Sequence, residues 1–282
     1  SREIIAKTID CNPKNIIFTS GATEANTLAL NCSKEMKTFI SSIEHDSVLK
    51  QNINANIIPV TLNGIVNLEV LENDLKKTTA EKLFVSIMAV NNETGIIQPL
   101  EDISKICKKY NAILHVDAVQ AIGRITISMN NLDIDLLTIS SHKIGGPKGV
   151  GCLAVSDQIY SLLSPIIMGG GQERGFRGGT EAVNQIIGFG AAAEYSQKLK
   201  LVNTLNSREA LEEKIFSMLP NAVIIGKNSP RVANTSLIAF KNISAESLVI
   251  ALDIEGYEVS SGSACSSGKI SDSHVLKAMH LD

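Results

Sequence analysis

Lys143 and Asp117 are the two residues whose types and spacing indicate chemistry most directly. Lys143 lies in SSHKIGGPKG, residues 140–149, and Asp117 lies 26 residues earlier in HVDAVQ, residues 115–120. An aldehyde cofactor needs a lysine for its Schiff base and a carboxylate that keeps its ring nitrogen protonated, so that the ring can accept electrons. The pair therefore indicates pyridoxal phosphate.

The elements that must position this pair support the same interpretation. Taken alone, Lys143 would be one cation on a solvated face, and Asp117 would be a helix cap after a buried strand. However, residues 113–116 and 136–139 have the apolar pattern of buried parallel strands, and each motif follows a strand directly. Open α/β sheets bind ligands beyond the carboxyl ends of their strands.

The composition excludes several other classes of protein. The chain has 282 residues and a net charge of −3, and its basic residues are spread along the sequence, so nucleic acid is not an expected partner. No apolar run is long enough to cross a bilayer, and residues 1–5 resemble an amphipathic helix rather than a signal peptide. We expect a cytoplasmic protein without a membrane partner, or an organellar one if a targeting peptide has been lost.

The cysteines argue against a disulfide framework and against a zinc site. They are odd in number, widely spaced and without a CxxC pair: Cys11, Cys32, Cys107, Cys152 and Cys265. We therefore expect reduced thiols and no metal.

The order of apolar runs predicts a mostly parallel sheet flanked by helices, followed by a smaller α+β part. Short β-rich runs alternate with helical ones from residue 15 to about 155, at residues 16–18, 38–40, 56–60 and 83–87. A helix is expected over residues 181–200 and a second one through residue 219, before strands at 222–225 and 235–240. We predict a large cofactor-binding domain over 1–200 and a small domain over 201–282.

A phosphate site is predicted where a strand leads into a helix at residues 19–26. Hydroxyl and backbone N–H groups of this segment, TSGATEAN, could receive a phosphate at the helix N-terminus, although a simple capping box would look similar. Ser140 and His142, beside Lys143, would add donors to the same phosphate. The nearby cofactor motif favours the phosphate interpretation.

The glycine-rich segment at residues 169–180 superficially resembles a nucleotide loop. It lacks the G-x-G-x-x-G spacing in a strand-turn-helix setting, so we reject a dinucleotide site. Its glycines are expected to allow turns and close backbone approach, and Thr180 is expected to cap the helix that follows.

Cys265 is the candidate nucleophile. It lies in SSGSACSSG, residues 260–268, a polar segment bounded by glycines that predicts an exposed loop. A loop thiol can attack a substrate, but it can also be a passive loop residue. The other four cysteines occupy apolar or helical patterns, where a buried, inert thiol is expected.

From Ile16 to about His280 the chain resembles the cysteine desulfurases of the NifS and IscS type. The resemblance is carried, in family order, by SGATEAN, EHDSV, NNETG, HVDAVQ, SSHKIGGPKGVG, GGGQERGFRGGT and SSGSACSSG. These enzymes form part of the aminotransferase class V group of fold-type I pyridoxal phosphate enzymes, which implies an aspartate aminotransferase-like fold. The last motif resembles the long-loop subgroup that supplies iron–sulfur assembly.

The resemblance implies roles for residues around the cofactor ring. Lys143 would form the Schiff base, Asp117 would face the ring nitrogen and Gln120 the ring hydroxyl. His45 would stack on the ring and take part in catalysis, and Asn92 would steady cofactor and substrate. Each alone would be read as an ordinary surface, turn or cap residue.

The resemblance also implies a phosphate cradle and a homodimer. Ala22, Thr23, Ser140 and His142 would hold the phosphate, and Thr180 would reach the cofactor of the partner subunit.

The implied reaction converts L-cysteine to L-alanine and leaves the sulfur on Cys265 as a persulfide, for an iron–sulfur scaffold or another acceptor protein. Both chain ends look truncated against the family, and the arginine that binds the substrate carboxylate would lie beyond Asp282. Two alternatives therefore stay open: a selenocysteine lyase or related lyase, and a truncated, inactive partner in sulfur transfer.

Overall fold

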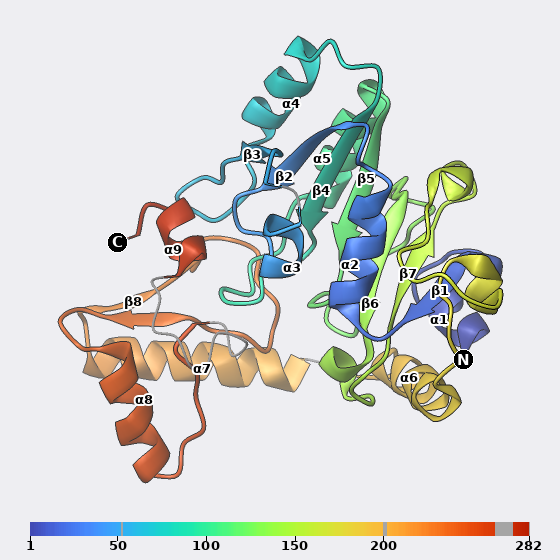
Figure 1. Ribbon diagram of the computed structural model, residues 1–282. Coiled ribbons are helices and arrows are strands. Elements are labelled where there is room, and N and C mark those ends of the chain that lie inside the picture. Colours follow the sequence, from blue (N-terminus) through green and yellow to red (C-terminus); the bar gives the residue numbers. More distant parts are fainter. Residues whose placement is uncertain (52, 200–201, 263–272, 282) are drawn as a thin grey trace.

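The computed structural model describes residues 1–51, 53–199, 202–262 and 273–281, and its centre is a seven-stranded sheet (Figure 1). The strand order is β1-β7-β6-β5-β4-β2-β3. The strands are β1 (Ile16–Thr19), β2 (Lys37–Ser41), β3 (Asn56–Ile58), β4 (Leu83–Met88), β5 (Ala112–Asp117), β6 (Leu136–Ser140) and β7 (Gly151–Val155).

The sheet is parallel except for one strand. The strands from β3 to β6 pair in parallel, whereas β7 runs antiparallel to both β6 and β1. The mostly parallel sheet is thus confirmed, but β7 was not among the predicted strands. Only residues 141–150 separate β6 from β7, and a parallel connection needs a crossover of about a dozen residues or more, so the chain returns antiparallel.

Helices cover both faces of the sheet, and alternate residues of the strands face the two layers. On one face Phe84 packs with Leu28 of α2 (Ala22–Asn31), and on the other Val85 packs with the layer that contains Ile103 of α5 (Leu100–Lys109). This period of two is the pattern of a strand buried on both sides. The remaining helices of this part are α1 (Arg2–Thr8), α3 (Asp46–Leu49), α4 (Leu68–Lys77), α6 (Val183–Ser196) and the short 3₁₀ turns η1 (Pro13–Asn15) and η3 (Tyr160–Leu162).

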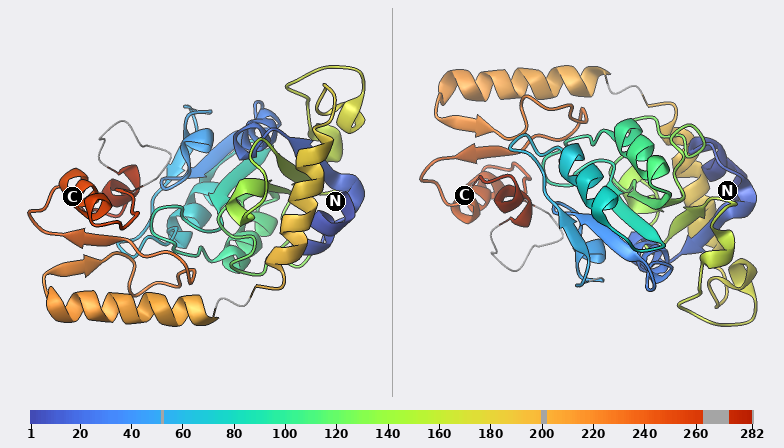
Figure 2. Two further views of the ribbon diagram at one scale, coloured as in Figure 1. Left: turned by 90° about the horizontal axis from the view of Figure 1, so that it is seen from below. Right: turned by 90° about the horizontal axis from the view of Figure 1, so that it is seen from above.

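A smaller two-stranded antiparallel sheet lies beside the large one (Figure 2). The elements of this C-terminal part of the chain are α7 (Val202–Met218), β8 (Ala222–Ile224), β9 (Ile238–Phe240), α8 (Ala245–Ile254) and α9 (His274–Ala278). Arg231 forms a bridge with Ile96 of the first part, and Val275 of α9 and its C-cap residue Met279 join the hydrophobic core of that part. The C-terminal part is therefore tied to the large sheet at two places.

The glycine-rich segment is docked on the outer edge of β1. Its 3₁₀ turn η4 (Gln172–Gly175) contains Glu173, whose Oε2 accepts the N–H of Phe18 at 3.0 Å. Arg2 donates to both carboxylate oxygens of Glu173, at 2.7 and 3.0 Å. The carbonyl of Ile16 accepts from Arg2 and, at 2.5 Å, from Arg174. The edge of the sheet is thus paired with side chains.

The predicted cap of the helix after this segment is wrong. The helix α6 begins at Val183, its N-cap is Ala182, and no side chain caps it. Arg177 forms a parallel bridge with Ile167, and the N–H of Gly178 donates to the carbonyl of Ile167 at 2.8 Å. This pairing holds the chain extended at Gly178. The helix therefore begins at Val183, too far along the chain for Thr180 to be its N-cap. Within the described ranges, no helix is long and apolar enough to cross a membrane.

Candidate active site

The predicted lysine and carboxylate lie beyond the carboxyl ends of two neighbouring parallel strands. Asp117 is the last residue of β5, and Lys143 lies in the 3₁₀ turn η2 (Ser141–Ile144), directly after β6. Burial raises the pKa of Asp117, whereas hydrogen bonds from Asn26 and Val119 and then electrostatic interactions with His45 and Lys143 oppose that rise. Asp117, His45 and Lys143 are therefore close enough to interact electrostatically.

Asp117 is held by two hydrogen-bond donors. Its Oδ2 accepts from Nδ2 of Asn26 at 2.8 Å, and its Oδ1 accepts from the N–H of Val119 at 3.0 Å. Asn26 comes from α2, on the face of the sheet that this helix covers, and is fully buried. Donors aimed at a buried carboxylate favour its charged form.

The same amide of Asn26 extends the network to His45. Its Nδ2 also donates to Oγ of Ser47 at 2.9 Å, and this hydroxyl lies 2.8 Å from Nδ1 of His45. The backbone N–H of Ser47 donates to the same Nδ1 at 3.0 Å, so His45 caps α3. Since Nδ1 accepts, the proton of the neutral ring is assigned to Nε2.

A second buried carboxylate, Glu44, lies next to this network. Burial first and the charge of Asp117 second raise the pKa of Glu44 well above its usual range, against one donor, the N–H of Met88 at 2.6 Å. Its Oε2 has no partner among the described residues. Of two buried neighbouring carboxyls, the one with fewer donors keeps the proton. Glu44 is thus the neutral acid and Asp117 the anion.

A row of hydrogen-bonded polar side chains crosses the sheet at His115, two residues before Asp117 in β5. Nδ1 of His115 lies 2.8 Å from Oγ of Ser86, and Nε2 lies 3.1 Å from Oγ1 of Thr138. This row joins β4, β5 and β6 across the strands that carry the site. Burial lowers the pKa of His115 to about 3, so the ring is neutral at physiological pH.

The start of α2 lies beside the end of β6, as a shared phosphate site requires. No side chain caps α2, whose first residues are Ala22 and Thr23, so its N-terminal N–H groups are open to an anion. Gly151 connects the two elements: it pairs with Ser140, and a β-carbon on it would lie 2.8 Å from the backbone of Gly21. A side chain at this position would push the elements apart.

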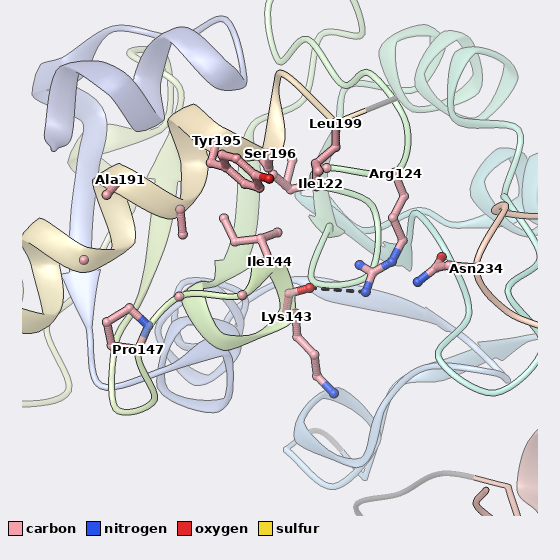
Figure 3. A pocket seen from close by; sticks show the side chains of 15 residues that line it. Ile122, Arg124, Lys143, Ile144, Pro147, Ala191, Tyr195, Ser196, Leu199 and Asn234 are labelled. Atoms are coloured by element: carbon pink, nitrogen blue, oxygen red, sulfur yellow. Dashed lines mark hydrogen bonds between the residues drawn. The ribbon is translucent and has the colours of Figure 1, made fainter. Parts of the chain in front are cut away.

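Arg124 ties the two cofactor motifs together. Its guanidinium donates to the carbonyl of Gln120 at 3.0 Å. It also donates to the carbonyl of Lys143 at 3.2 Å (Figure 3). One planar cation thus fixes the turn after β5 against the turn after β6.

A pocket of about 610 Å³ lies behind Lys143, between η2 and α6. Its wall includes Arg124, Ile144, Tyr195 and Leu199, and the ammonium group of Lys143 points away from this wall (Figure 3). The pocket is therefore a neighbour of the candidate site and not the space into which Lys143 projects.

The remaining predicted residues are placed differently. His142 is largely exposed. Partial desolvation of its ring first, and then the charges of Lys143 and Lys148, lower its pKa. Asn92 is half-buried in the turn after β4, and Thr180 is exposed in the segment before α6. Asp117 is hydrogen-bonded to Asn26 and Val119 and not to any of these three residues, and Cys265 lies outside the described residues.

Cys32, Cys107 and Cys152 are buried, as the sequence predicts, whereas Cys11 is only half-buried. Burial raises the pKa of Cys11, Cys32 and Cys107 to about 12, and that of Cys152 further. Within the described part of the chain, no group of three or more His, Cys, Asp or Glu side chains is arranged to hold a metal ion.

Sequence reasoning missed Asn26, Ser47 and Arg124. Asn26 and Ser47 belong to the quoted motifs SGATEAN and EHDSV, but nothing in the sequence shows that the two motifs meet. A buried position for a polar residue was the available signal, because Asn26 is flanked by Ala25 and precedes Leu28 on the core face of α2. Arg124 gave no sequence signal.

The chain is similar to known proteins over its whole length. The profile of the aminotransferase class-V family matches residues 1–280. The chain is 40% identical to the cysteine desulfurase IscS of Rickettsia typhi and 39% identical to the mitochondrial cysteine desulfurase of Arabidopsis thaliana. All of this chain is covered in both alignments, and it spans 71% and 65% of those relatives.

A solved structure shows the same fold. The NifS-like protein from Rickettsia africae superposes with a TM-score of 0.91 at 36% identity, over all of this chain and 78% of that one. The fold is that of the fold-type I enzymes, a group that uses pyridoxal phosphate. The chain belongs to the aminotransferase class-V family, within its cysteine desulfurases of the IscS and NifS type.

Proposed function

We propose that this chain is a pyridoxal phosphate-dependent cysteine desulfurase that converts L-cysteine to L-alanine and takes the sulfur on Cys265. The observation that carries the proposal is the network from Asp117 through Asn26 and Ser47 to His45, with Lys143 beside it. Relatives that carry the name cysteine desulfurase support the choice of reaction over the alternatives of a selenocysteine lyase and an inactive partner.

The donor set fits pyridoxal phosphate. The ammonium group of Lys143 forms no hydrogen bond or ion pair with any described residue, so it is available to an aldehyde. Asp117 is a buried anion that could pair with a ring N–H, and the uncapped start of α2 could receive a phosphate. When bound, the cofactor would supply an electron sink for the carbanion at the substrate's α-carbon.

The residues around the cofactor ring would have different roles in binding and proton transfer. Lys143 would hold the cofactor and, once its amine is released, take the proton from the α-carbon of L-cysteine. Asp117 would keep the ring nitrogen protonated, because the donors from Asn26 and Val119 keep it charged. His45 would stack on the ring with its Nδ1 fixed by Ser47, while Gln120 and Asn92 would bind the ring hydroxyl and the substrate.

A second group of residues would bind the phosphate and contact the partner subunit. The N–H groups at Ala22 and Thr23 and the side chains of Thr23, Ser140 and His142 would hold the phosphate. In a homodimer Thr180, which is exposed, would reach the cofactor of the other subunit.

The sulfur transfer is a displacement at sulfur. The thiolate of Cys265 attacks the substrate's sulfur, the new S–S bond forms, and the C–S bond breaks. The electron pair of the broken bond goes to the carbon skeleton, which takes up a proton and leaves as L-alanine. Cys265 is left as a persulfide, ready for an acceptor protein such as an iron–sulfur scaffold.

We further propose that residues 1–200 bind the cofactor and that residues 201–282 carry the cysteine. The relatives include bacterial and mitochondrial proteins, which supports either a cytoplasmic or an organellar location.

The proposal is tested by the visible absorption spectrum of the protein with pyridoxal phosphate, before and after L-cysteine. Lys143→Ala should lose the band of the lysine-bound cofactor, whereas the matched control Lys148→Ala, an exposed lysine of the same loop, should keep it. Cys265→Ser should keep the band and fail to release sulfide or alanine. Sulfide release by Cys265→Ser at the parent rate would exclude Cys265 as the nucleophile.

A further inference from the structure

Glu44 joins several elements of the fold at the position directly before His45. Its backbone N–H donates to the carbonyl of Ser41, the last residue of β2, at 3.3 Å. Its carbonyl accepts from Nε2 of His274, the first residue of α9, at 2.9 Å. Its side chain is fully buried and contacts the end of β4. The backbone of Glu44 is thus held on two sides, and the side chain supplies a third contact.

The side-chain contact lies at the strand end that carries Asp117. Oε1 of Glu44 accepts the N–H of Met88, the last residue of β4, at 2.6 Å. Met88 lies opposite Asp117 in the parallel pairing of β4 with β5. The N–H of Ala89 then donates to the carbonyl of Asp117 at 2.9 Å. The side chain of Glu44 therefore spans from the residue before His45 to the strand pair at Asp117.

Glu44 makes this contact as an uncharged acid. Its Oε2 has no hydrogen-bond partner among the residues that the structure describes, and the neighbouring charge that acts on it is that of the anion Asp117. A carboxylate buried in such surroundings would be costly, so the group keeps its proton. The contact with Met88 consequently depends on the length of the side chain and on its acceptor oxygen, and not on a negative charge.

The direction of the His45 ring depends on the segment that Glu44 holds. His45 has an extended backbone, with φ of −65° and ψ of 151°, and its Nδ1 accepts the N–H of Ser47 as the N-cap of α3. Because α3 has only four residues, it contributes little helix stability of its own. The place of the imidazole is therefore set by how the chain enters α3, and Glu44 is the residue at that entry.

We propose that Glu44 is a positioning residue for His45: its side chain, hydrogen-bonded to the N–H of Met88, holds the imidazole at a fixed place relative to Asp117. The inference rests on the proposed function, in which His45 stacks on the cofactor ring. Glu44 itself touches neither substrate nor cofactor in this account and transfers no proton.

Two substitutions separate the length of this side chain from its acidity. Glu44→Gln keeps an acceptor oxygen at the same reach for the N–H of Met88 and loses the acid. Glu44→Asp keeps the acid and is one methylene shorter. A positioning role predicts that the glutamine variant resembles the parent and the aspartate variant does not, whereas a role in proton transfer predicts the opposite order.

The first readout is the proton–nitrogen NMR spectrum of the His45 ring in the cofactor-free protein, at a pH where the ring is neutral. The chain has five histidines, and His45→Gln assigns the signal. The parent and Glu44→Gln should show one tautomer, with the proton on Nε2. Glu44→Asp should show nitrogen shifts averaged between two tautomers, because Nδ1 loses its fixed donor. Glu101→Gln, at an exposed glutamate in α5, is the matched control and should equal the parent.

The second readout is the rate of alanine formation from L-cysteine by the protein loaded with pyridoxal phosphate. Glu44→Asp should bind the cofactor and lose about tenfold or more in kcat, because a misplaced group costs rate. Glu44→Gln should keep most of the parent kcat, since His45 stays in place.

Three outcomes would overturn the inference. Loss of kcat and of the single tautomer in Glu44→Gln would show that the acid itself is required. Parent kcat and a parent tautomer in Glu44→Asp would show that the reach of the side chain is unimportant. Global unfolding of Glu44→Asp, seen by circular dichroism, would show a role in stability instead. A parent protein that bound no cofactor would contradict the proposed function, while the NMR comparison, made without cofactor, would still decide whether Glu44 positions His45.

Discussion

Nδ2 of Asn26 lies 2.8 Å from Oδ2 of Asp117, although the two residues are 91 positions apart in the sequence. The same nitrogen reaches Ser47 at 2.9 Å, so one amide on α2 joins the end of β5 to the start of α3. Asp117 is thereby kept charged and His45 is kept in one tautomer by the same contact.

Asn26→Ala should weaken the binding of pyridoxal phosphate about tenfold, because Asp117 loses a buried donor worth about 1 to 2 kcal/mol and is ionised less readily. A titration of the cofactor-free protein, followed by absorbance, measures the dissociation constant. Asn31→Ala is the matched control, since Asn31 is on the same helix and donates to the carbonyl of Ser164 far from the site. An unchanged constant in Asn26→Ala would separate this network from cofactor binding.

Glu173→Ala should destabilise the protein by about 2 kcal/mol, because Arg2 and the N–H of Phe18 lose their acceptor. This loss is modest for a buried carboxylate, because the Arg2 side chain is 31% exposed and solvent weakens the ion pair. Urea denaturation measures the free energy of unfolding. Glu194→Ala removes an exposed i,i+4 partner of Lys198 and should change stability by less than about 0.5 kcal/mol.

His115 should make stability depend on pH below neutrality. Burial lowers its pKa in the folded protein to about 3, below the usual 6.5, so between these values the unfolded chain binds the extra proton. Stability is therefore present above pH 6.5 and is lost as the pH falls, by about 2 kcal/mol between pH 7 and pH 5.

The variant His115→Gln isolates the contribution of His115 to the pH dependence of stability, because it removes the titrating group. Urea denaturation at pH 7 and pH 5 should show a fall in the free energy of unfolding that is about 2 kcal/mol smaller in the variant than in the parent. Equal falls in both proteins would mean that His115 is not the group responsible.

Alkylation should distinguish the cysteines. Burial raises the pKa of Cys11, Cys32, Cys107 and Cys152, so few of these thiols are ionised and they should react slowly with iodoacetamide at about pH 7.5. Peptide mass mapping of the folded protein should find Cys265 labelled first, and Cys265→Ser should lose this early product. Early labelling of Cys152 would contradict the burial argument.

Much of the fold could be predicted because the strands carry their own signal. The runs that became β1, β2, β4, β5 and β6 are buried on both faces and read as continuous apolar segments. The strand β7 was not predicted because its five residues directly follow a glycine-rich turn, a pattern that indicates a loop rather than a strand.

Residues of the candidate site could be predicted from the sequence where the chemistry requires a particular residue type. They could not be predicted where a residue's role depends only on its partner in the folded protein. Lys143 and Asp117 stand out because a Schiff base needs an amine and a ring nitrogen needs a carboxylate. Asn26 and Arg124 act through groups that are distant in sequence, and an amide or a guanidinium suits many surface positions equally well. Their roles depend on tertiary contacts that no local pattern encodes.

The occupied edge of β1 has a consequence for association between chains. An exposed edge strand offers free N–H and C=O groups to which a strand of another molecule can add, which is a route to aggregation. Glu173, Arg2 and Arg174 already bind these groups at Phe18 and Ile16. At the other edge of the sheet, β3 has only three residues, and an edge strand this short offers few such groups to another chain.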